Sequence, residues 1–506
     1  MNTGTCIIIG GGMGGLFAGA LLAKNGIRVT VLEKNAVAGG GLQSFRRNGI
    51  EFDTGMHVMG GLLPGGNLHR ICSYLGILAR IDLHHINPEC MDEILIESTG
   101  DIYRIPSGRE AFVKAMSDYF PDEAEGIRRY VDELYRITSE LPLYYLKETD
   151  EATFEHSENF NLPADRLIAR YVSDPKCREI LAYLNPLYSG MKGHSPAYIH
   201  ALINVLYING TSRFKGGSLQ LVDALCDVIR DAGGDVVTGC EVTELAMTGR
   251  HVDYVSSADG RRFSADTYIS DIHPSNLLGM TPPGAFPKAF ANRLNEIPDT
   301  CSAFSIYIEF HPESFPYIPH TCYAVADYGM IWNQHQPPPG QWPASIMYMT
   351  PPVAGQGDYA SHMLIHTLMD FNETEKWRDT VTGRRGTDYE LWKRSKAETV
   401  IRRMNAIFPG FADCIKSIHT ASPLTIRDFY ATRNGSIFGY REDAGNPLLS
   451  RLSVKTKIDN LLLTGQNVSF HGNCGVPLTA INTAEAILGR NFILRQINSC
   501  YENIVN

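Results

Sequence analysis

Residues 5–34, TCIIIGGGMGGLFAGALLAKNGIRVTVLEK, decide the fold of this chain. The apolar run from Cys6 to Ile9 predicts a buried parallel strand, and glycines in the register G-x-G-x-x-G follow it. A helical run from Leu16 to Lys24 then leads into a second strand from Arg28 to Leu32. This order is the β-α-β unit with which proteins bind a dinucleotide.

The glycines of this unit each have a physical role. Gly10 permits the tight turn, Gly12 lets the backbone approach a pyrophosphate, and Gly15 lets the helix pack closely on the strands. The pyrophosphate is then expected on the free N–H groups at the positive end of the helix, beside Met13 and Gly14. Glu33 stands 18 residues after Gly15, where a carboxylate holds a ribose hydroxyl and disfavours the 2′-phosphate of NADP.

Two other interpretations of this stretch fit less well. A glycine-rich turn of some other α/β protein would not need the helix, the second strand and the terminal acid in this order. A signal peptide or a membrane helix would fit the uncharged run Cys6–Ala23, but the run is rich in glycine and has no preceding Lys or Arg. A bound dinucleotide is therefore the prediction.

Composition and charge narrow the class of protein. The 506 residues allow two or three domains or one large interleaved architecture, and 44% are hydrophobic and 20% charged, as in ordinary globular proteins. A net charge of −10 argues against a nucleic-acid partner and against docking on anionic lipid. The 11 cysteines form no C-x-x-C pair, so neither a metal site nor a disulfide framework is indicated. We expect a reducing, cytoplasmic compartment.

A second glycine cluster follows the first unit. Gly39, Gly40 and Gly41 form another loop that lets a ligand approach the backbone, and Thr54-Gly55 brings the chain back towards the same place. An NAD dehydrogenase does not need this loop, whereas a flavoprotein whose FAD runs back across the sheet does. The expected cofactor is therefore FAD.

The motifs GGGMGG, LEKN, AGGGLQSFRRNGIEFDTGMH and LLLTGQ together resemble the superfamily of phytoene desaturases, carotenoid isomerases and retinol saturases, which are FAD-dependent oxidoreductases. Within it, FDTGMH and residues 200–217, HALINVLYINGTSRFKGG, are most similar to all-trans-retinol 13,14-reductase (retinol saturase) proteins. The similarity covers both ends and the middle of the chain. It implies an α/β fold in which a Rossmann-type FAD-binding domain is interleaved with an α+β substrate-binding domain.

The resemblance also implies which residues contact FAD. In relatives the strand matching Val242 passes the adenine, and a C-terminal helix directs its positive end at the flavin. We therefore expect that helix to start at Gly475-Val476-Pro477, with Pro477 in its first turn. The expected FAD contacts are Gly10, Gly12, Met13, Gly14, Gly15, Glu33, Lys34, Gly40, Gly41, Leu42, Gln43, Thr54, Gly55, Met56, Val242, Gly465, Gln466, Gly475, Val476 and Pro477.

Two positions depart from the pattern of the superfamily. Gly41 stands where relatives often have an arginine, so the positive charge near the pyrophosphate or flavin is expected from Arg46 or Arg47, or is absent. Gln466 stands where many relatives have an acid. The second departure concerns the contacts to the ribityl chain and not the presence of FAD.

The rest of the chain alternates between these two expected domains. The FAD-binding domain is predicted over 1–75, 205–278 and 420–506, and the substrate-binding domain over 76–204 and 279–419, as a helical cap plus an antiparallel sheet. Apolar spacing predicts helices over 67–78, 108–120, 122–140, 164–172, 175–183, 196–208 and 387–408. Alternating runs predict strands over Ala303–Phe310, Cys322–Ala326, Ser345–Met349 and Met363–Met369.

The expected chemistry acts on carbon–carbon double bonds of a lipophilic polyene of the retinoid, carotenoid or isoprenoid kind. Reduced FAD would saturate C=C by hydride transfer while an acid or water protonates the other carbon. The resemblance implies that His57, Tyr207 and His471 face the flavin. For each of them the alternative role is a hydrogen bond that holds a loop in place. One dinucleotide motif is visible, so the reductant is a transiently bound NAD(P)H or another donor.

Other functions share this scaffold. A polyene desaturase or a redox-neutral cis–trans isomerase would use the same cofactor site. A lipid escort protein would use the apolar groove without flavin, which the intact glycine set and Glu33 argue against. An amine oxidase is a further possibility, without a paired-aromatic signal to favour it.

Peripheral membrane contact is a weaker expectation. Residues 311–320 and 332–343 are rich in proline and aromatic residues and could form a lip that touches a membrane, although long surface loops explain them better. No uncharged run of membrane-spanning length occurs outside the first unit. The sequence therefore favours a cytoplasmic protein that could lie against the inner face of a membrane.

Overall fold

A five-stranded parallel sheet carries the glycine-rich N-terminal unit in the computed structural model, which describes residues 4–55, 58–149 and 155–505. Its strand order is β10-β2-β1-β14-β20, and every pairing is parallel. The strands are β1 (Thr5–Ile9), β2 (Arg28–Leu32), β10 (Asp235–Val237), β14 (Thr267–Ser270) and β20 (Leu461–Leu463). The continuous apolar runs fit this sheet because helices and loops cover both of its faces.

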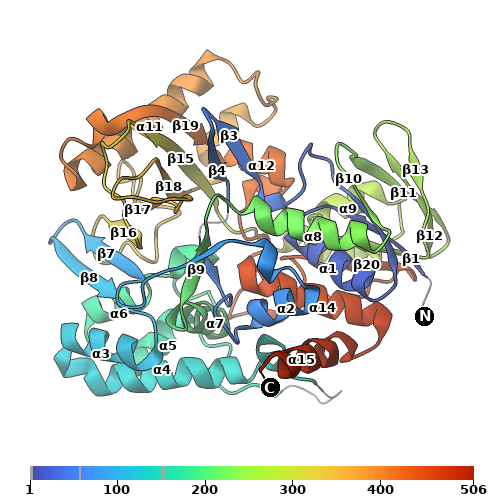
Figure 1. The fold of residues 1–506 in the computed structure, drawn as a ribbon, viewed down its shortest axis with the longest axis horizontal. Helices are drawn as coiled ribbons and strands as arrows, with labels where there is room; N and C mark the ends of the chain where they lie inside the picture. The colour runs from blue at the N-terminus through green and yellow to red at the C-terminus, as the bar shows by residue number, and fades with distance from the viewer. Residues whose placement is uncertain (1–3, 56–57, 150–154, 506) are drawn as a thin grey trace.

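The helix α1 (Met13–Lys24) is buried over most of its length against this sheet. It packs between α8 (Leu219–Asp231) and α14 (Gly472–Leu488), which come from the middle and the end of the chain. Figure 1 shows these three helices close together beside the parallel sheet. The first unit predicted from the sequence is thus present, and distant segments complete its packing.

A seven-stranded, mostly antiparallel sheet forms the second large element. Its order is β19-β15-β18-β17-β16-β7-β8, with strands β15 (Ser302–Phe310), β16 (Thr321–Val325), β17 (Ser345–Met349), β18 (His362–Met369) and β19 (Ile415–Ala421). The four predicted strands are confirmed. The hairpin β7 (Asp92–Ile96) and β8 (Asp101–Ile105) was not predicted, and it joins the sheet through a parallel pairing with β16.

Helices surround the second sheet on two sides. The helix α11 (Thr387–Ile407) shares an apolar core with the sheet. A layer of helices from the first half of the chain lies on the other side, at the lower left of Figure 1. These helices match the predicted ranges within a few residues: α3 (Arg109–Tyr119), α4 (Ala124–Ser139), α5 (Ala164–Tyr171), α6 (Pro175–Leu181) and α7 (Ala197–Ile208). The predicted helix at 67–78 is also present as α2 (Asn67–Leu75), and it packs on α15 (Phe492–Val505).

Smaller elements connect these parts. Three small sheets consist of β3 (Ser44–Arg47) and β4 (Ile50–Asp53), of β5 (Met59–Gly60), β9 (Thr211–Phe214) and β6 (Leu83–His85), and of β11 (Val242–Thr248), β12 (His251–Ser257) and β13 (Arg262–Phe263). The remaining helices are α9 (Pro274–Met280), α10 (Lys288–Glu296), α12 (Pro423–Tyr430) and α13 (Pro447–Ser450).

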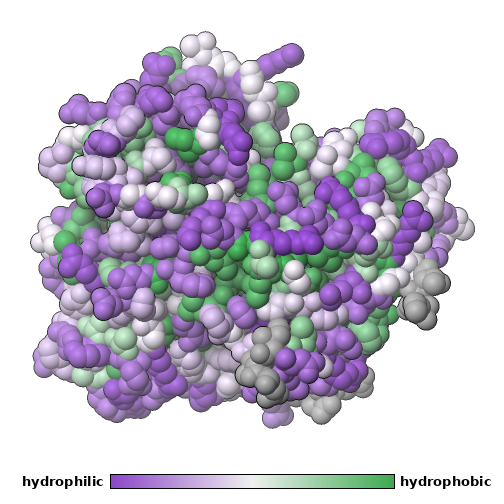
Figure 2. Space-filling view, in the orientation of Figure 1, coloured by the Kyte–Doolittle hydropathy of each residue, from purple (hydrophilic) through white to green (hydrophobic). Residues whose placement is uncertain are grey.

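The expected α/β class with a Rossmann-type sheet is confirmed, while the domain boundaries stay a prediction. No helix in the described part of the chain is both long enough and apolar enough to span a bilayer. The face in Figure 2 is largely hydrophilic, with hydrophobic residues gathered near its centre. Contact with a membrane surface also stays a prediction.

Candidate FAD and substrate site

The carboxyl ends of the parallel strands meet at one edge of the sheet. Gly10 follows β1, Glu33 follows β2 and Asp271 follows β14, while Gly465 lies two residues after β20. In open sheets of this kind, ligands bind in the crevice at this edge. The strand order therefore brings four segments of the chain to one ligand site.

The two glycine loops touch each other directly. Gly10 has φ 103°, which only glycine adopts without strain, and its N–H donates to the Leu32 carbonyl at 2.9 Å. The Gly39 N–H donates to the Gly11 carbonyl at 2.7 Å, and a Cβ on Gly40 would lie 3.1 Å from the Cα of Gly12. The predicted second loop thus continues the surface that the first one begins.

The carboxylate of Glu33 holds the glycine turn in place. Its Oε2 accepts the Gly11 N–H at 2.8 Å, and its Oε1 accepts the Asn35 N–H at 2.7 Å. The side chain is buried but still lines the cavity described below. Glu33 therefore orders the backbone of this turn in addition to the ribose contact that the sequence predicts.

Asp271 is a site residue that the sequence analysis missed. A Cβ on Gly12 would lie 2.7 Å from its Oδ2, and its Oδ1 lies against Gly14 and Gly465. Burial raises the pKa of the Asp271 carboxyl to about 7, while N–H groups of Gly15 and Gly12 oppose the shift. Its position directly after an apolar strand was the available signal, because carboxyl ends of parallel strands carry binding residues.

A single large cavity extends from the glycine turns towards the seven-stranded sheet, with a volume of about 570 Å³. Many of the predicted site residues line it: Gly10, Gly12, Met13, Gly14, Glu33, Lys34, Gly40, Gly41, Leu42, Thr54, Gly55, Tyr207, Val242, Gln466, His471, Gly475 and Val476. Four others do not line it: Gly15, Gln43, Gly465 and Pro477. Met56 and His57 lie outside the described residues.

The residues away from the cavity wall have packing roles. A Cβ on Gly15 would collide with the Gly10 carbonyl, so this glycine allows the close approach of helix and strand that the sequence predicts. The Gln43 side-chain amide donates to the Val37 carbonyl at 2.9 Å and closes the second loop. Gly465, at φ 88°, makes room for the Asp271 carboxylate.

The expected arginine charge is not at the cavity. Arg46 is exposed and pairs with Glu51 at 3.1 Å, and neither Arg46 nor Arg47 lines the cavity. Instead, the Tyr430 hydroxyl lies 3.7 Å from where a Cβ on Gly41 would be. Among the described lining residues Lys34 is the only lysine or arginine. Tyr430 from α12 therefore fills the space into which an arginine at position 41 would extend.

The C-terminal helix begins earlier than the sequence suggests. We expected a start at Gly475, whereas α14 starts at Gly472 and has Pro477 inside it. Pro477 lacks the N–H that would bond to the Asn473 carbonyl, so the extra turn is held by fewer hydrogen bonds. The Asn473 amide supports it instead by donating to the Val58 carbonyl at 3.0 Å. Its N-terminus lines the cavity, as the flavin assignment requires.

Tyr207 and His471 are both neutral at this cavity. Burial lowers the pKa of the His471 imidazole to about 4, so it carries no extra proton near pH 7. Burial raises the pKa of the Tyr207 phenol, so it keeps its proton. No described residue hydrogen-bonds to the Tyr207 hydroxyl. Each side chain thus carries a single hydrogen, on the phenol oxygen or on an imidazole nitrogen, and the Tyr207 hydroxyl is the one on the face of α7 that lines the cavity.

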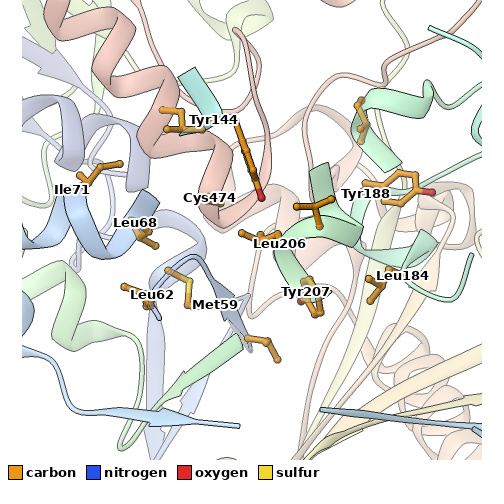
Figure 3. Close-up of a cluster of buried hydrophobic side chains, with 14 of the residues drawn as sticks. Met59, Leu62, Leu68, Ile71, Tyr144, Leu184, Tyr188, Leu206, Tyr207 and Cys474 are labelled. Atoms are coloured by element: carbon orange, nitrogen blue, oxygen red, sulfur yellow. The ribbon is translucent and has the colours of Figure 1, made fainter. Parts of the chain in front are cut away.

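The part of the cavity away from the glycine loops has an apolar and aromatic side, formed by α7, and a mixed side, formed by the seven-stranded sheet and its loops. One face of α7 contributes Tyr198, Ile199, Leu202, Ile203, Leu206 and Tyr207, and the opposite wall includes Met347 of β17 and Tyr323 of β16. Figure 3 shows Leu206 and Tyr207 near Met59 and Cys474, where β5 and the start of α14 meet. The second half of the cavity thus fits a long apolar ligand that ends at the start of α14.

The model of the flavin containing amine oxidoreductases matches residues 13–488. The chain belongs to this family. Known relatives include the all-trans-retinol 13,14-reductase of Macaca fascicularis, 26% identical over 96% of this chain and 85% of that protein. Prolycopene isomerase 2 of an Oncidium hybrid cultivar is also 26% identical, over 91% of this chain and 79% of that protein. The resemblance to the retinol saturase superfamily is therefore confirmed.

The fold is shared with solved flavoproteins. The structure of putrescine oxidase bound to putrescine matches with a TM-score of 0.63 at 12% identity, over 99% of both chains. The cofactor of this flavin oxidoreductase is FAD, as predicted. The residues present fit it, because side chains at Gly12 and Gly14 would collide with the Asp271 carboxylate and narrow the trough beside the α1 N-terminus.

A second cluster of ligand-type side chains lies outside the cavity. Within the described ranges, Glu93, His320 and Cys322 bring their ligand atoms within 4.8 Å of one another on the seven-stranded sheet. Arg104 already donates to the Glu93 carboxylate at 3.0 Å. The cluster is thus explained as part of an ion-pair network and plays no part in the flavin site.

Proposed function

We propose that this flavin oxidoreductase acts on carbon–carbon double bonds of a lipophilic polyene and saturates them. The observation that carries the proposal is one continuous cavity, whose wall passes from the glycine loops to the apolar face of α7 and to the seven-stranded sheet. A polyene is a flat, extended, apolar molecule that fits such a channel. The retinol reductase and prolycopene isomerase relatives act on molecules of this kind according to their names.

The protein residues would divide the work as follows. The glycine loops, Glu33 and the N-terminus of α14 hold FAD, which when bound supplies hydride chemistry at its N5. The apolar side chains of α7 and β17 hold the double bond in place and exclude water. The Tyr207 hydroxyl donates a proton to the carbon that does not receive the hydride. A proton from solvent would restore the Tyr207 hydroxyl, and NAD(P)H or another donor would supply the hydride for the next turnover.

The individual FAD contacts belong to this proposal. Residues that line the cavity near the two glycine loops and at Gln466, Gly475 and Val476 would contact FAD directly. Gly15, Gln43, Gly465 and Pro477 would act through the backbone that they position. Val242 would contact the adenine end, since it lies in β11 beside the carboxyl end of β2.

One experiment separates the possible reactions. The purified protein is examined for a flavin spectrum, reduced anaerobically and incubated with retinoid and carotenoid panels. A product mass two units above the substrate supports saturation, a mass two units below supports desaturation, and an isomer of unchanged mass supports isomerisation, which the prolycopene isomerase relatives favour as the second candidate. A colourless protein that takes up no FAD would contradict an enzymatic role and favour a lipid carrier.

Oxidation of amines is the activity named by the putrescine oxidase neighbour. Including aliphatic amines in the same panel tests it. Release of hydrogen peroxide from amines under air, with no change in the polyenes, would replace the proposed function.

A further inference from the structure

The helix α7 runs along the cavity wall, so its rise per residue gives the distance between two points on that wall. Tyr198, Leu202 and Leu206 line the cavity from successive turns of the helix. An α-helix rises about 1.5 Å per residue, so the eight steps from Tyr198 to Leu206 span about 12 Å. The two ends of this face therefore lie at different depths along the channel.

The C-terminal end of α7 marks the reaction end of the channel. A Cβ on Gly60 would lie 2.7 Å from Leu206 Cδ2, so the helix packs directly on β5. Val58, two residues earlier, accepts a hydrogen bond from Asn473 at the start of α14. Figure 3 shows the same neighbourhood, with Leu206 and Tyr207 near Met59 and Cys474. A double bond in reach of the flavin would lie here.

The N-terminal end of the same face carries a carboxylate. The Tyr198 hydroxyl donates to Glu442 Oε2 at 2.6 Å, and both residues line the cavity. The side chain of Ser450 is a second hydrogen-bond donor to the Glu442 carboxyl. Glu442 is therefore a carboxyl group in the cavity wall, and because a carboxylate offers about four acceptor positions, two donors leave capacity for a ligand.

The surroundings of Glu442 favour a neutral partner. Burial raises the pKa of the Glu442 carboxyl, and the negative charge of a bound carboxylate would disfavour its ionised form further. The guanidinium of Arg451 lies 5.2 Å from the centre of the Tyr198 ring and already supplies a positive charge nearby. The electrostatic attraction would therefore contribute less to the binding of an ammonium group here than in a site with an isolated carboxylate. A hydroxyl can donate to the Glu442 carboxyl without adding a charge.

We propose that Glu442, positioned by Tyr198, binds a hydroxyl group at the end of the polyene about 12 Å from the reacting double bond. The proposal rests on the proposed function, because it takes the start of α14 as the reaction end. It restricts the substrate to oxygenated polyenes and excludes pure hydrocarbons as the preferred ligands. Glu442 then selects the substrate and sets its direction in the channel.

Ligand binding to the FAD-loaded protein tests the proposal. Dissociation constants are measured by flavin absorbance and by tryptophan fluorescence for isoprenoid alcohols, their hydrocarbons, their carboxylic acids and their primary amines at matched length. We expect each alcohol to bind at least about tenfold more tightly than its hydrocarbon, since a hydrogen bond to a charged or buried group contributes about 1.5 kcal/mol or more. Only chains long enough to span about 12 Å should perturb the flavin spectrum.

Two variants and a control complete the test. Glu442→Leu should remove the preference for the alcohol, and Glu442→Gln should strengthen binding of the acid by about tenfold, because the amide can donate to it. Glu485→Gln removes another half-buried carboxyl away from the cavity and should change none of these constants. The circular dichroism and flavin content of each variant establish that it is folded.

The outcomes distinguish this inference from the proposed function. Equal binding of alcohol and hydrocarbon by the unmodified protein, or unchanged constants in both folded Glu442 variants, would overturn the role of Glu442. Tighter binding of the amine than of the alcohol would overturn the assignment of a hydroxyl. The ligands could bind in the expected order while no polyene is converted to a product under reducing or oxidising conditions. That result would support the role of Glu442 and contradict the proposed function.

Discussion

Asp271 sits where the negative charge of a pyrophosphate is expected. Its carboxylate lies against Gly12, Gly14 and Gly465 beside the α1 N-terminus, and Glu33 is the other charged group that acts on it. Burial and the negative charge of Glu33 together oppose its ionisation, so its pKa rises to about 7. A second negative group close by would oppose ionisation further, because like charges repel.

Replacing Asp271 tests whether its ionisation opposes the binding of FAD. Protonated Asp271 tolerates the pyrophosphate and ionised Asp271 repels it, so the affinity for FAD should fall as the pH rises from about 6 to above about 7. Asp271→Asn should bind FAD with little dependence on pH over this range. Titration of the apoprotein with FAD at several pH values, followed by flavin fluorescence, measures the effect. A parallel pH dependence in both proteins would contradict it.

Tyr207 is the residue through which the proposed proton transfer can be tested. Tyr207→Phe removes the only polar atom of the side chain and keeps its packing, so FAD should remain bound with an unchanged spectrum. Turnover of a polyene should fall by about 100-fold or more, the usual contribution of a positioned acid. Anaerobic single-turnover assays of product formation measure it.

A control variant separates this effect from loss of a buried phenol in general. Tyr135→Phe removes a hydroxyl that donates to Asn209 at 2.7 Å, away from the cavity. Its turnover should stay within about twofold of the unmodified protein, since a peripheral hydrogen bond contributes about 1 kcal/mol to stability and nothing to the reaction. Equal turnover of Tyr207→Phe and Tyr135→Phe would assign the proton to water or to another residue.

At the scale of the elements, the packing of α1 against two other segments shapes the cofactor trough. The helix begins beside the carboxyl ends of β14 and β20, and Gly14 leaves no room for a side chain there. A Cβ on Gly14 would lie 2.7 Å from the Cα of Gly465, which is backbone and cannot move aside. The geometry of this junction thus depends on a glycine in the first turn of α1.

Gly14→Ala should therefore weaken FAD binding. Overpacking costs about 1–3 kcal/mol, which corresponds to a loss of affinity of roughly 5- to 150-fold if it falls on the bound geometry. Equilibrium dialysis with FAD measures the change. Gly279→Ala in α9 is the matched control, because nothing lies within 4 Å of its added Cβ. Equal affinities of the two variants would show that the trough adapts to the extra methyl group.

At the scale of the whole molecule, one cavity joins segments that are far apart in the sequence. Residues within 9–55, 58–60, 144–207, 240–280, 303–368 and 426–478 all contribute to its wall. A ligand that binds only the folded state stabilises it by about 2.7 kcal/mol at 100 times its dissociation constant. FAD should therefore stabilise both large sheets together and not the parallel sheet alone.

Limited proteolysis followed by mass spectrometry tests this expectation. Saturating FAD should raise the melting temperature by a few degrees and slow cleavage in the seven-stranded sheet as well as in the glycine loops. The Gly14→Ala variant should show less protection at the same FAD concentration. Protection confined to residues near α1 would mean that the two sheets unfold independently.

Much of the fold follows from local patterns. The first β-α-β unit, the strands of residues 302–369 and the helices of the cap were predicted because apolar periodicity and glycine spacing are local properties of the sequence. The hairpin at residues 92–105 was missed, since its short strands lie between predicted helices and it joins the sheet through a distant strand, β16. Such long-range pairing leaves no local signal.

The candidate site also has a part that the sequence predicted and a part that only the tertiary structure showed. The amino-acid sequence by itself determined the cofactor and predicted the glycines that would hold it, because a backbone approach to a pyrophosphate needs glycine at fixed spacing. Only the tertiary structure decided that Asp271, Tyr430 and Glu442 join the cavity, since these residues come from separate strands, helices and loops. It also decided that His471 is neutral and that Tyr430 occupies the place of an arginine, because burial and neighbours are set when distant segments pack together.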